Sequence, residues 1–154
     1  MPCGRDAHIA FGTAAAAEAA GILDDFCAAE ALPAAVSWRL RVVLDEVMAN
    51  VVSHAAPLGG GGVDLCLRRD AEVVEMQVSD DGPAFDPVAR PAPDVTLPLD
   101  ARQPGGLGIA LMKSLMDEVR YERTTRNILT VRKRIAAAVA EDEAGGHEHS
   151  AKHS

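Results

Sequence analysis

The sequence predicts an α+β fold: a two-layer sandwich of a mixed or antiparallel β-sheet with helices packed on one face. Short runs of alternating polar and apolar residues recur in pairs joined by turns, as expected for antiparallel strands. Longer stretches with apolar residues at helical spacing separate these runs. A chain of 154 residues, 48% of them hydrophobic, supports one compact domain, which we expect to span residues 1–136.

The amino-terminal part is expected to hold one strand and two helices. Asp6–Gly12 alternates as a strand, and Thr13 is expected to cap an alanine-rich helix that runs to about Leu32. Pro33 then opens a second helix over Ala34–Ala55, whose apolar residues form a stripe. A following proline and glycine run ends this helix.

The middle of the chain is expected to form a hairpin and then a long loop. Val63–Arg69 and Glu72–Ser79 alternate as strands around a short turn. Proline-rich residues 83–104 show no periodicity, and loops of this length within a small domain are usually functional or disordered. We therefore expect a lid over residues 83–104 that orders over a ligand.

The carboxy-terminal part is expected to hold one helix and a final hairpin. The helix runs from Gly105 to about Asp117, and the strands are Glu118–Arg123 and Ile128–Ile135. Residues 137–154 are acidic and histidine-rich, so we expect a flexible tail there and assign its histidines no metal.

Charge and cysteine usage exclude several classes of protein. The formal charge of −8 argues against nucleic acid as a partner, because a protein that binds nucleic acid would require a basic surface. No apolar run approaches the ~20 residues needed to cross a bilayer, and no signal-peptide pattern is present, so no membrane partner is expected. Three widely spaced cysteines fit reduced thiols, and we expect a cytoplasmic protein.

The first candidate segment for a functional site lies on the second helix. Glu46, Asn50 and His54 follow one another by one turn each and so share a face. Alone they would indicate a solvated surface, but the later segments favour a ligand. Asn50 can offer Mg²⁺ a neutral oxygen, and Glu46 can act as a general base. Asp45 points elsewhere and is a weaker candidate, and we expect His54 to close the helix end.

The second candidate segment follows the hairpin. Asp80 ends an apolar strand, where a carboxylate can accept a hydrogen bond from the exocyclic amine of a base. Gly82 lets a flat ring approach the backbone. A simple Asp-Gly turn is the alternative interpretation. Phe85, just beyond, is expected to anchor the loop by packing.

The third candidate segment, Gly105-Gly106-Leu107-Gly108, lies where the loop becomes a helix. A helix start offers phosphate unpaired N–H groups and the positive end of the helix dipole. The segment is not a Walker loop, because Ile109 and Ala110 stand where that motif has its lysine and hydroxyl. Together, the three segments predict an ATP site that uses Mg²⁺.

With these segments in this order, the chain resembles the GHKL superfamily of ATP-binding domains over roughly Thr13–Ile135. Within that group it is similar to the bacterial anti-sigma factor serine kinases, most of all over residues 105–119. Ala84 departs from the pattern, since it replaces the second glycine of Asp-x-Gly-x-Gly, and we expect weaker binding to persist. The resemblance implies Glu46 as the catalytic base, Asn50 as the Mg²⁺ ligand, and Asp80, Gly82, Ala84, Gly105, Gly106, Leu107 and Gly108 around the nucleotide.

The resemblance implies a function as well as a site. Such a protein is a serine/threonine kinase that binds a sigma factor and phosphorylates a STAS-type anti-anti-sigma protein, and a homodimer is expected by analogy. One alternative is a catalytically weak or inactive module that binds nucleotide and holds a partner. A GHKL ATPase or a histidine-kinase catalytic domain is less favoured, because each needs a further domain that we do not find in these 154 residues.

Overall fold

The computed structural model describes residues 3–54, 61–82 and 106–153. In chain order the elements are β1 (Cys3–Ala10), α1 (Ala15–Ala29), α2 (Ala34–His54), β2 (Gly62–Arg69), β3 (Val73–Asp80), α3 (Gly106–Leu115), β4 (Glu118–Arg123), β5 (Asn127–Arg134) and α4 (Ile135–His153). Each expected helix and strand is present with bounds shifted by a few residues, and α4 is additional. The expected lid at 83–104, with Phe85, lies outside the described residues.

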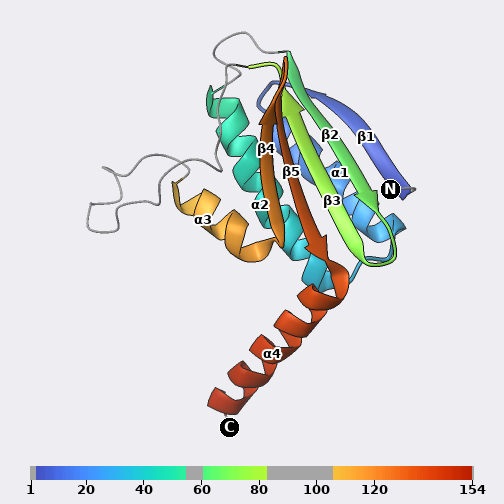
Figure 1. The fold of residues 1–154 in the computed structure, drawn as a ribbon, viewed down its shortest axis with the longest axis vertical. Helices are drawn as coiled ribbons and strands as arrows, with labels where there is room; N and C mark the ends of the chain where they lie inside the picture. Colours follow the sequence, from blue (N-terminus) through green and yellow to red (C-terminus); the bar gives the residue numbers. More distant parts are fainter. Residues whose placement is uncertain (1–2, 55–60, 83–105, 154) are drawn as a thin grey trace.

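The strands form a 5-stranded sheet in the order β1-β2-β3-β5-β4, and each neighbouring pair is antiparallel. In Figure 1, α1 and α2 lie across one face of this sheet, and α3 lies beside α2. The expected two-layer α+β sandwich is therefore confirmed, with an antiparallel sheet in the described part of the chain. Because β5 lies between β3 and β4, the end of β3 is next to the beginning of β5.

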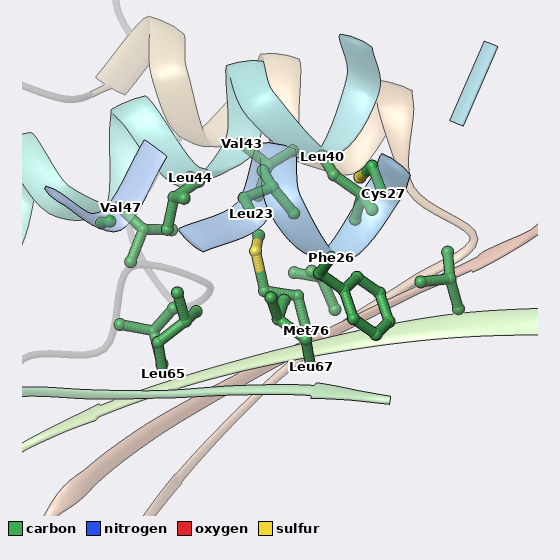
Figure 2. Close-up of a cluster of buried hydrophobic side chains, with 14 of the residues drawn as sticks. Leu23, Phe26, Cys27, Leu40, Val43, Leu44, Val47, Leu65, Leu67 and Met76 are labelled. Carbon is green, nitrogen blue, oxygen red and sulfur yellow. The ribbon is translucent and has the colours of Figure 1, made fainter. Parts of the chain in front are cut away.

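The core lies between the helices and one face of the sheet. Side chains alternate along β2 and β3, so that every second residue faces the helices. Burying an aliphatic side chain contributes about 1.5–3 kcal/mol, so these contacts hold α2 firmly against β3. The central side chains, each at most 1% exposed, are Leu23, Leu40, Leu44, Leu65, Leu67 and Met76 (Figure 2).

Both ends of α1 differ from the sequence prediction. The expected cap Thr13 is not used, because Ala14 takes the N-cap position without a side-chain hydrogen bond. The helix ends before Leu32, because Ala31 adopts a φ of 50° and reverses the chain. The N–H of Leu32 then bonds back to the carbonyl of Cys27 at 3.0 Å, a common way to close a helix.

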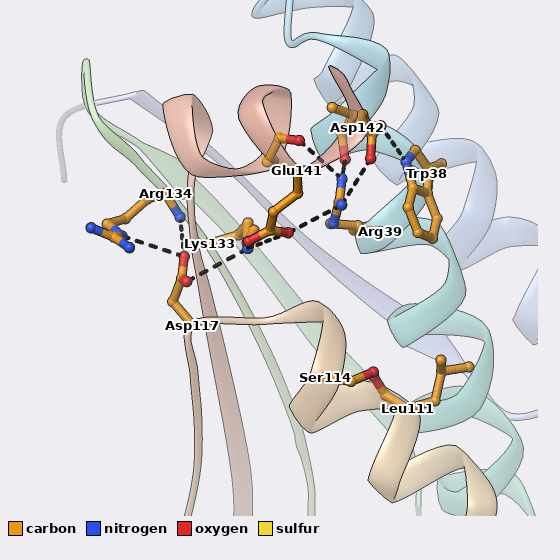
Figure 3. Close-up of polar contacts among 11 residues, drawn as sticks. Trp38, Arg39, Leu111, Ser114, Asp117, Lys133, Arg134, Glu141 and Asp142 are labelled. Atoms are coloured by element: carbon orange, nitrogen blue, oxygen red, sulfur yellow. Dashed lines mark hydrogen bonds and ion pairs between the residues drawn. The ribbon is translucent and has the colours of Figure 1, made fainter. Parts of the chain in front are cut away.

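The chain continues as helix α4 where the sequence analysis expected a flexible tail over residues 137–154. The structure gives this segment a helical backbone, and two buried cations hold the first turns of α4, while the flexibility of residues 137–154 stays a prediction. Arg39 of α2 pairs with Glu141 and Asp142, and Lys133 of β5 pairs with Glu141 (Figure 3). In the described ranges no helix, α4 included, combines the length and apolarity needed to span a membrane.

Candidate functional site

A small pocket with a free volume of about 30 Å³, partly open to solvent, lies between α2 and the adjoining ends of β3, β4 and β5. Its walls are mainly aliphatic, and a carboxylate and two side-chain amides supply most of its polar groups. Apolar walls with a few convergent polar groups are typical of small-molecule sites. The lining residues are Val47, Asn50, Val51, Val78, Asp80, Tyr121, Asn127 and Leu129.

Asp80 is the acidic group of this pocket. It is the last residue of β3, and strand alternation turns it toward the helices, where it is only 6% exposed. Its Oδ1 accepts hydrogen bonds from the backbone N–H of Gly82 at 2.8 Å and from Nδ2 of Asn127 at 3.1 Å. An ionised carboxylate only accepts hydrogen bonds, so Asp80 can receive a donor from a bound molecule.

Asn50 faces the same pocket from α2. The side chain is 8% exposed, and its Nδ2 has no hydrogen-bond partner among the described residues. An unpaired buried amide costs about 1–3 kcal/mol, and native structures contain few such groups. Since an amide can present either its N–H or its oxygen after a half-turn, Asn50 fits a pocket completed by a polar ligand or a metal ion.

The other polar residues expected on α2 lie outside this pocket. Glu46, one turn before Asn50, is partly buried and is not one of the described lining residues. Asp45 points away from the pocket as expected: it pairs with Arg41 at 3.3 Å and lines a separate hollow. The backbone of His54 ends α2, and its side chain lies outside the described residues.

The sequence analysis missed three polar residues of this region. Tyr121 and Asn127 line the pocket, and the guanidinium of Arg123 donates a hydrogen bond to the carbonyl of Gly82 at 2.8 Å. The sequence analysis began the last strand at Ile128, whereas Asn127 is the first residue of β5 and pairs directly with Asp80. The pairing of β3 with β5 joins distant segments, so no local sequence signal could reveal it.

The residues expected around the phosphates are described only in part. Gly106, Leu107 and Gly108 are the first residues of α3, where a helix offers unpaired N–H groups. Ala84 and Gly105 lie outside the described residues. Phosphate binding by this segment therefore stays a prediction.

The predicted binding of Mg²⁺ rests on Asn50. Within the described ranges, no group of three or more His, Cys, Asp or Glu side chains could hold a metal ion. Mg²⁺ at nucleotide sites keeps several waters and phosphate oxygens and needs few protein ligands. The buried amide of Asn50, whose Nδ2 has no partner in the described part of the chain, fits such a role, which stays a prediction.

Comparison with curated proteins identifies a kinase relative. The serine/threonine-protein kinase BtrW of Bordetella bronchiseptica is 38% identical over 92 residues, which cover 56% of this chain. The match spans about 65% of the length of BtrW. This relative shares sequence with the present chain over somewhat more than half of it.

Two solved structures share the fold. The RsbU and RsbW domains of Rv1364c from Mycobacterium tuberculosis give a TM-score of 0.63 at 15% identity, covering 86% of this chain and 32% of that one. The SiaB–SiaC complex from Pseudomonas aeruginosa gives a TM-score of 0.51 at 16% identity, covering 85% of this chain and 89% of that one.

The histidine kinase-like ATPase domain family matches residues 10–133 of this chain. Because that match extends over most of the sequence, the protein belongs to the histidine kinase-like ATPase domain family.

Proposed function

We propose that this protein is an ATP-dependent serine/threonine kinase that also acts as an anti-sigma factor in a partner-switching system. Its substrate is a small anti-anti-sigma protein of the STAS type. Phosphorylation releases that protein, and the kinase, as a homodimer, then binds its sigma factor.

One observation carries this proposal: Asn50 of α2 and Asp80 of β3 line the same pocket. An adenine ring has apolar faces and an exocyclic amine that donates hydrogen bonds. Val47, Val51 and Leu129 offer apolar walls for such a ring, and Asp80 offers an acceptor. The Nδ2 of Asn50, which meets no partner among the residues that the structure describes, fits a site that a ligand completes.

The proposed roles follow from the chemistry of each side chain. ATP supplies the γ-phosphoryl group, and Mg²⁺ offsets the charge of the phosphate oxygens. Asp80 accepts a hydrogen bond from the adenine amine, and Asn50 gives Mg²⁺ its oxygen. Glu46 accepts the proton of the attacking substrate hydroxyl. The hydroxyl oxygen forms a bond to the γ-phosphorus, and the bond between that phosphorus and the oxygen that stays with ADP breaks. N–H groups at the start of α3, near Gly106 and Gly108, hold the phosphates.

The relatives support a protein as the substrate. BtrW is a serine/threonine-protein kinase, and SiaB, which has the same fold, was solved in a complex with SiaC. A small protein partner that receives a phosphoryl group therefore fits better than a small-molecule acceptor.

The test is a phosphotransfer assay on the full chain in three versions: wild type, Glu46→Ala and Asp45→Ala. Each is incubated with Mg²⁺ and γ-phosphate-labelled ATP in lysate of the source organism. Asp45 provides a matched control, since it is the neighbouring carboxylate on α2 and faces away from the pocket. We expect a labelled small protein with the wild type and with Asp45→Ala, and none with Glu46→Ala.

ATP binding measured on the same preparations distinguishes the possible failures. If all three versions bind ATP and none labels a protein, the protein is a nucleotide-gated binding module. If Glu46→Ala labels the substrate as well as the wild type does, Glu46 is not the base. If the wild type binds no ATP, the nucleotide site itself is wrong.

A further inference from the structure

One oxygen of the Asp80 carboxylate is already used by the protein. Oδ1 accepts one hydrogen bond from the backbone N–H of Gly82 at 2.8 Å and a second from Nδ2 of Asn127 at 3.1 Å. A carboxylate oxygen has two lone pairs, so Oδ1 has no acceptor capacity left. In the described part of the chain no hydrogen bond engages Oδ2, which leaves a single oxygen of Asp80 for a ligand.

The orientation of the Asn127 amide follows from its other contacts. The hydroxyl of Tyr121 and the guanidinium of Arg123 both donate to Oδ1 of Asn127, the latter at 3.1 Å. Because a guanidinium can only donate, the amide oxygen must face Arg123, and Nδ2 must face Asp80 and the carbonyl of Gly82. Asn127 is 7% exposed and pairs with Asp80 in the β3–β5 register, so it is held in place.

A single free oxygen distinguishes the two purine bases. Adenine presents one exocyclic amine beside a ring nitrogen that accepts, so it needs one acceptor from a carboxylate. Guanine presents a ring N–H and an amine side by side and pairs best with both oxygens of a carboxylate, in a bidentate contact. A carboxylate with one oxygen saturated therefore accepts adenine fully and guanine only in part.

We propose that Asn127 is a specificity-determining residue: by occupying Oδ1 of Asp80, it restricts the pocket to adenine nucleotides. This proposal rests on the proposed function, in which the pocket binds ATP. Asn127 acts through Asp80 as a positioning residue, and Tyr121 and Arg123 fix its amide.

The experiment compares ADP and GDP binding to the full chain by isothermal titration calorimetry, which needs no kinase activity. Wild type is expected to prefer ADP. Asn127→Ala frees one acceptor site on Oδ1, while the hydrogen bond from Gly82 remains, so the ADP-to-GDP affinity ratio should fall by about tenfold, the size of one hydrogen bond to a charged group. Tyr121→Phe keeps the ring in the pocket and removes one donor to Asn127, so it should shift the ratio the same way by a smaller factor.

Gln77→Ala is the matched control. Gln77 is an amide on β3 that bonds to Thr130 across the same strand pair and does not line the pocket. Gln77→Ala should leave the ADP-to-GDP affinity ratio unchanged.

Two results would overturn the role of Asn127 and leave the proposed nucleotide site unaffected. One is a parallel loss of ADP and GDP affinity in Asn127→Ala, and the other is a wild type that binds both nucleotides equally. If Asn127→Ala does not fold, Tyr121→Phe decides the question. A wild type that binds neither nucleotide overturns the proposed function itself.

Discussion

Lys133 of β5 and Glu141 of α4 form an ion pair in which the lysine is almost completely buried. The lysine Nζ lies 3.0 and 3.2 Å from the two carboxylate oxygens, and its side chain is 2% exposed. The same carboxylate lies 3.1 Å from the buried guanidinium of Arg39. One acidic group therefore pairs with two cations that come from different elements (Figure 3).

Removal of the charge of Glu141 should destabilise the protein more than removal of the charge of Lys133. Glu141→Gln leaves Asp117 as the carboxylate partner of Lys133 and Asp142 as that of Arg39, and it should cost about 2 kcal/mol in the free energy of unfolding. Lys133→Met replaces the cation with an apolar chain and leaves Glu141 paired with Arg39, so about 1 kcal/mol or less is expected. Urea denaturation measures both values.

Glu143→Gln is the control for this comparison. Glu143 is exposed on α4 and makes no ion pair among the described residues, so its loss should change the free energy of unfolding by less than about 0.5 kcal/mol. Equal destabilisation by Glu141→Gln and Glu143→Gln would show that helix charge, and not the ion pair with Lys133, controls the attachment of α4.

Asp142 gives the attachment of α4 a dependence on pH. The indole N–H of Trp38 donates to its carboxylate at 2.9 Å, and the guanidinium of Arg39 lies 2.8 Å away. These hydrogen bonds, that of the indole first, hold the pKa of Asp142 below its usual 3.8. A carboxyl with a lowered folded-state pKa stabilises the fold above its unfolded pKa. That contribution disappears as the pH falls through the folded pKa.

The measurement is the difference in the free energy of unfolding between wild type and Asp142→Asn, followed from about pH 6 to about pH 3. The difference should be constant at the upper end and should shrink below the usual carboxyl pKa of 3.8. Trp38→Phe removes the first donor and should give an intermediate profile. A difference that does not vary over this range would exclude Asp142 as a source of acid sensitivity.

Local periodicity was enough to predict the elements that carry the candidate site. The apolar stripe of α2 placed Asn50 on a separate polar face, and the alternation of β3 placed Asp80 at a strand end. The structure brings Asn50 and Asp80 to one pocket. Glu46, expected to act with them, lies one turn away and outside the lining, so its role is still a prediction.

Long-range contacts explain what the sequence did not reveal. Asn127 faces Asp80 only because β5 inserts between β3 and β4. Helix α4 depends on a buried lysine: Lys133 follows Leu129 and Val131 on the inward face of β5, where a cation needs a carboxylate partner. That inward lysine was the one local sign that the following acidic residues pack against the domain.

Cys66 should be an unreactive thiol on the outer face of the sheet. Partial burial, followed by a hydrogen bond to Asp6, raises the pKa of Cys66 to about 11. Since the thiolate is the reactive form, alkylation by iodoacetamide at about pH 8 should be slow. Asp6→Ala removes the acceptor and its negative charge, so the rate at Cys66 should rise several-fold. Mass spectrometry resolves the modified site.

Asp64→Ala is the matched variant for this thiol. Asp64 lies on the same outer face and pairs with His8 and Arg126 instead of contributing to the pKa of Cys66. It should leave the alkylation rate at Cys66 unchanged. Equal acceleration by Asp6→Ala and Asp64→Ala would point to a loosened sheet and not to a change in the thiol pKa.

Asn50→Ala should separate metal binding from base recognition at the proposed nucleotide site. ADP affinity is measured by calorimetry in excess Mg²⁺ and again in EDTA, for wild type, Asn50→Ala and Ser53→Ala. Ser53 is a matched control on α2, because its hydroxyl bonds to the carbonyl of Ala49 and it lines the separate hollow. The proposed contact of the base with Asp80 does not require the metal, so affinity in EDTA should be similar in all three proteins.

The Mg²⁺-dependent gain in affinity is the informative quantity. In Asn50→Ala it should fall by about tenfold, as expected when a metal site loses a protein group that orders it. Ser53→Ala should keep the full gain. If Asn50→Ala weakens binding equally with and without Mg²⁺, then Asn50 contacts the nucleotide directly. Its buried, unpartnered Nδ2 would then be the group that meets the ligand.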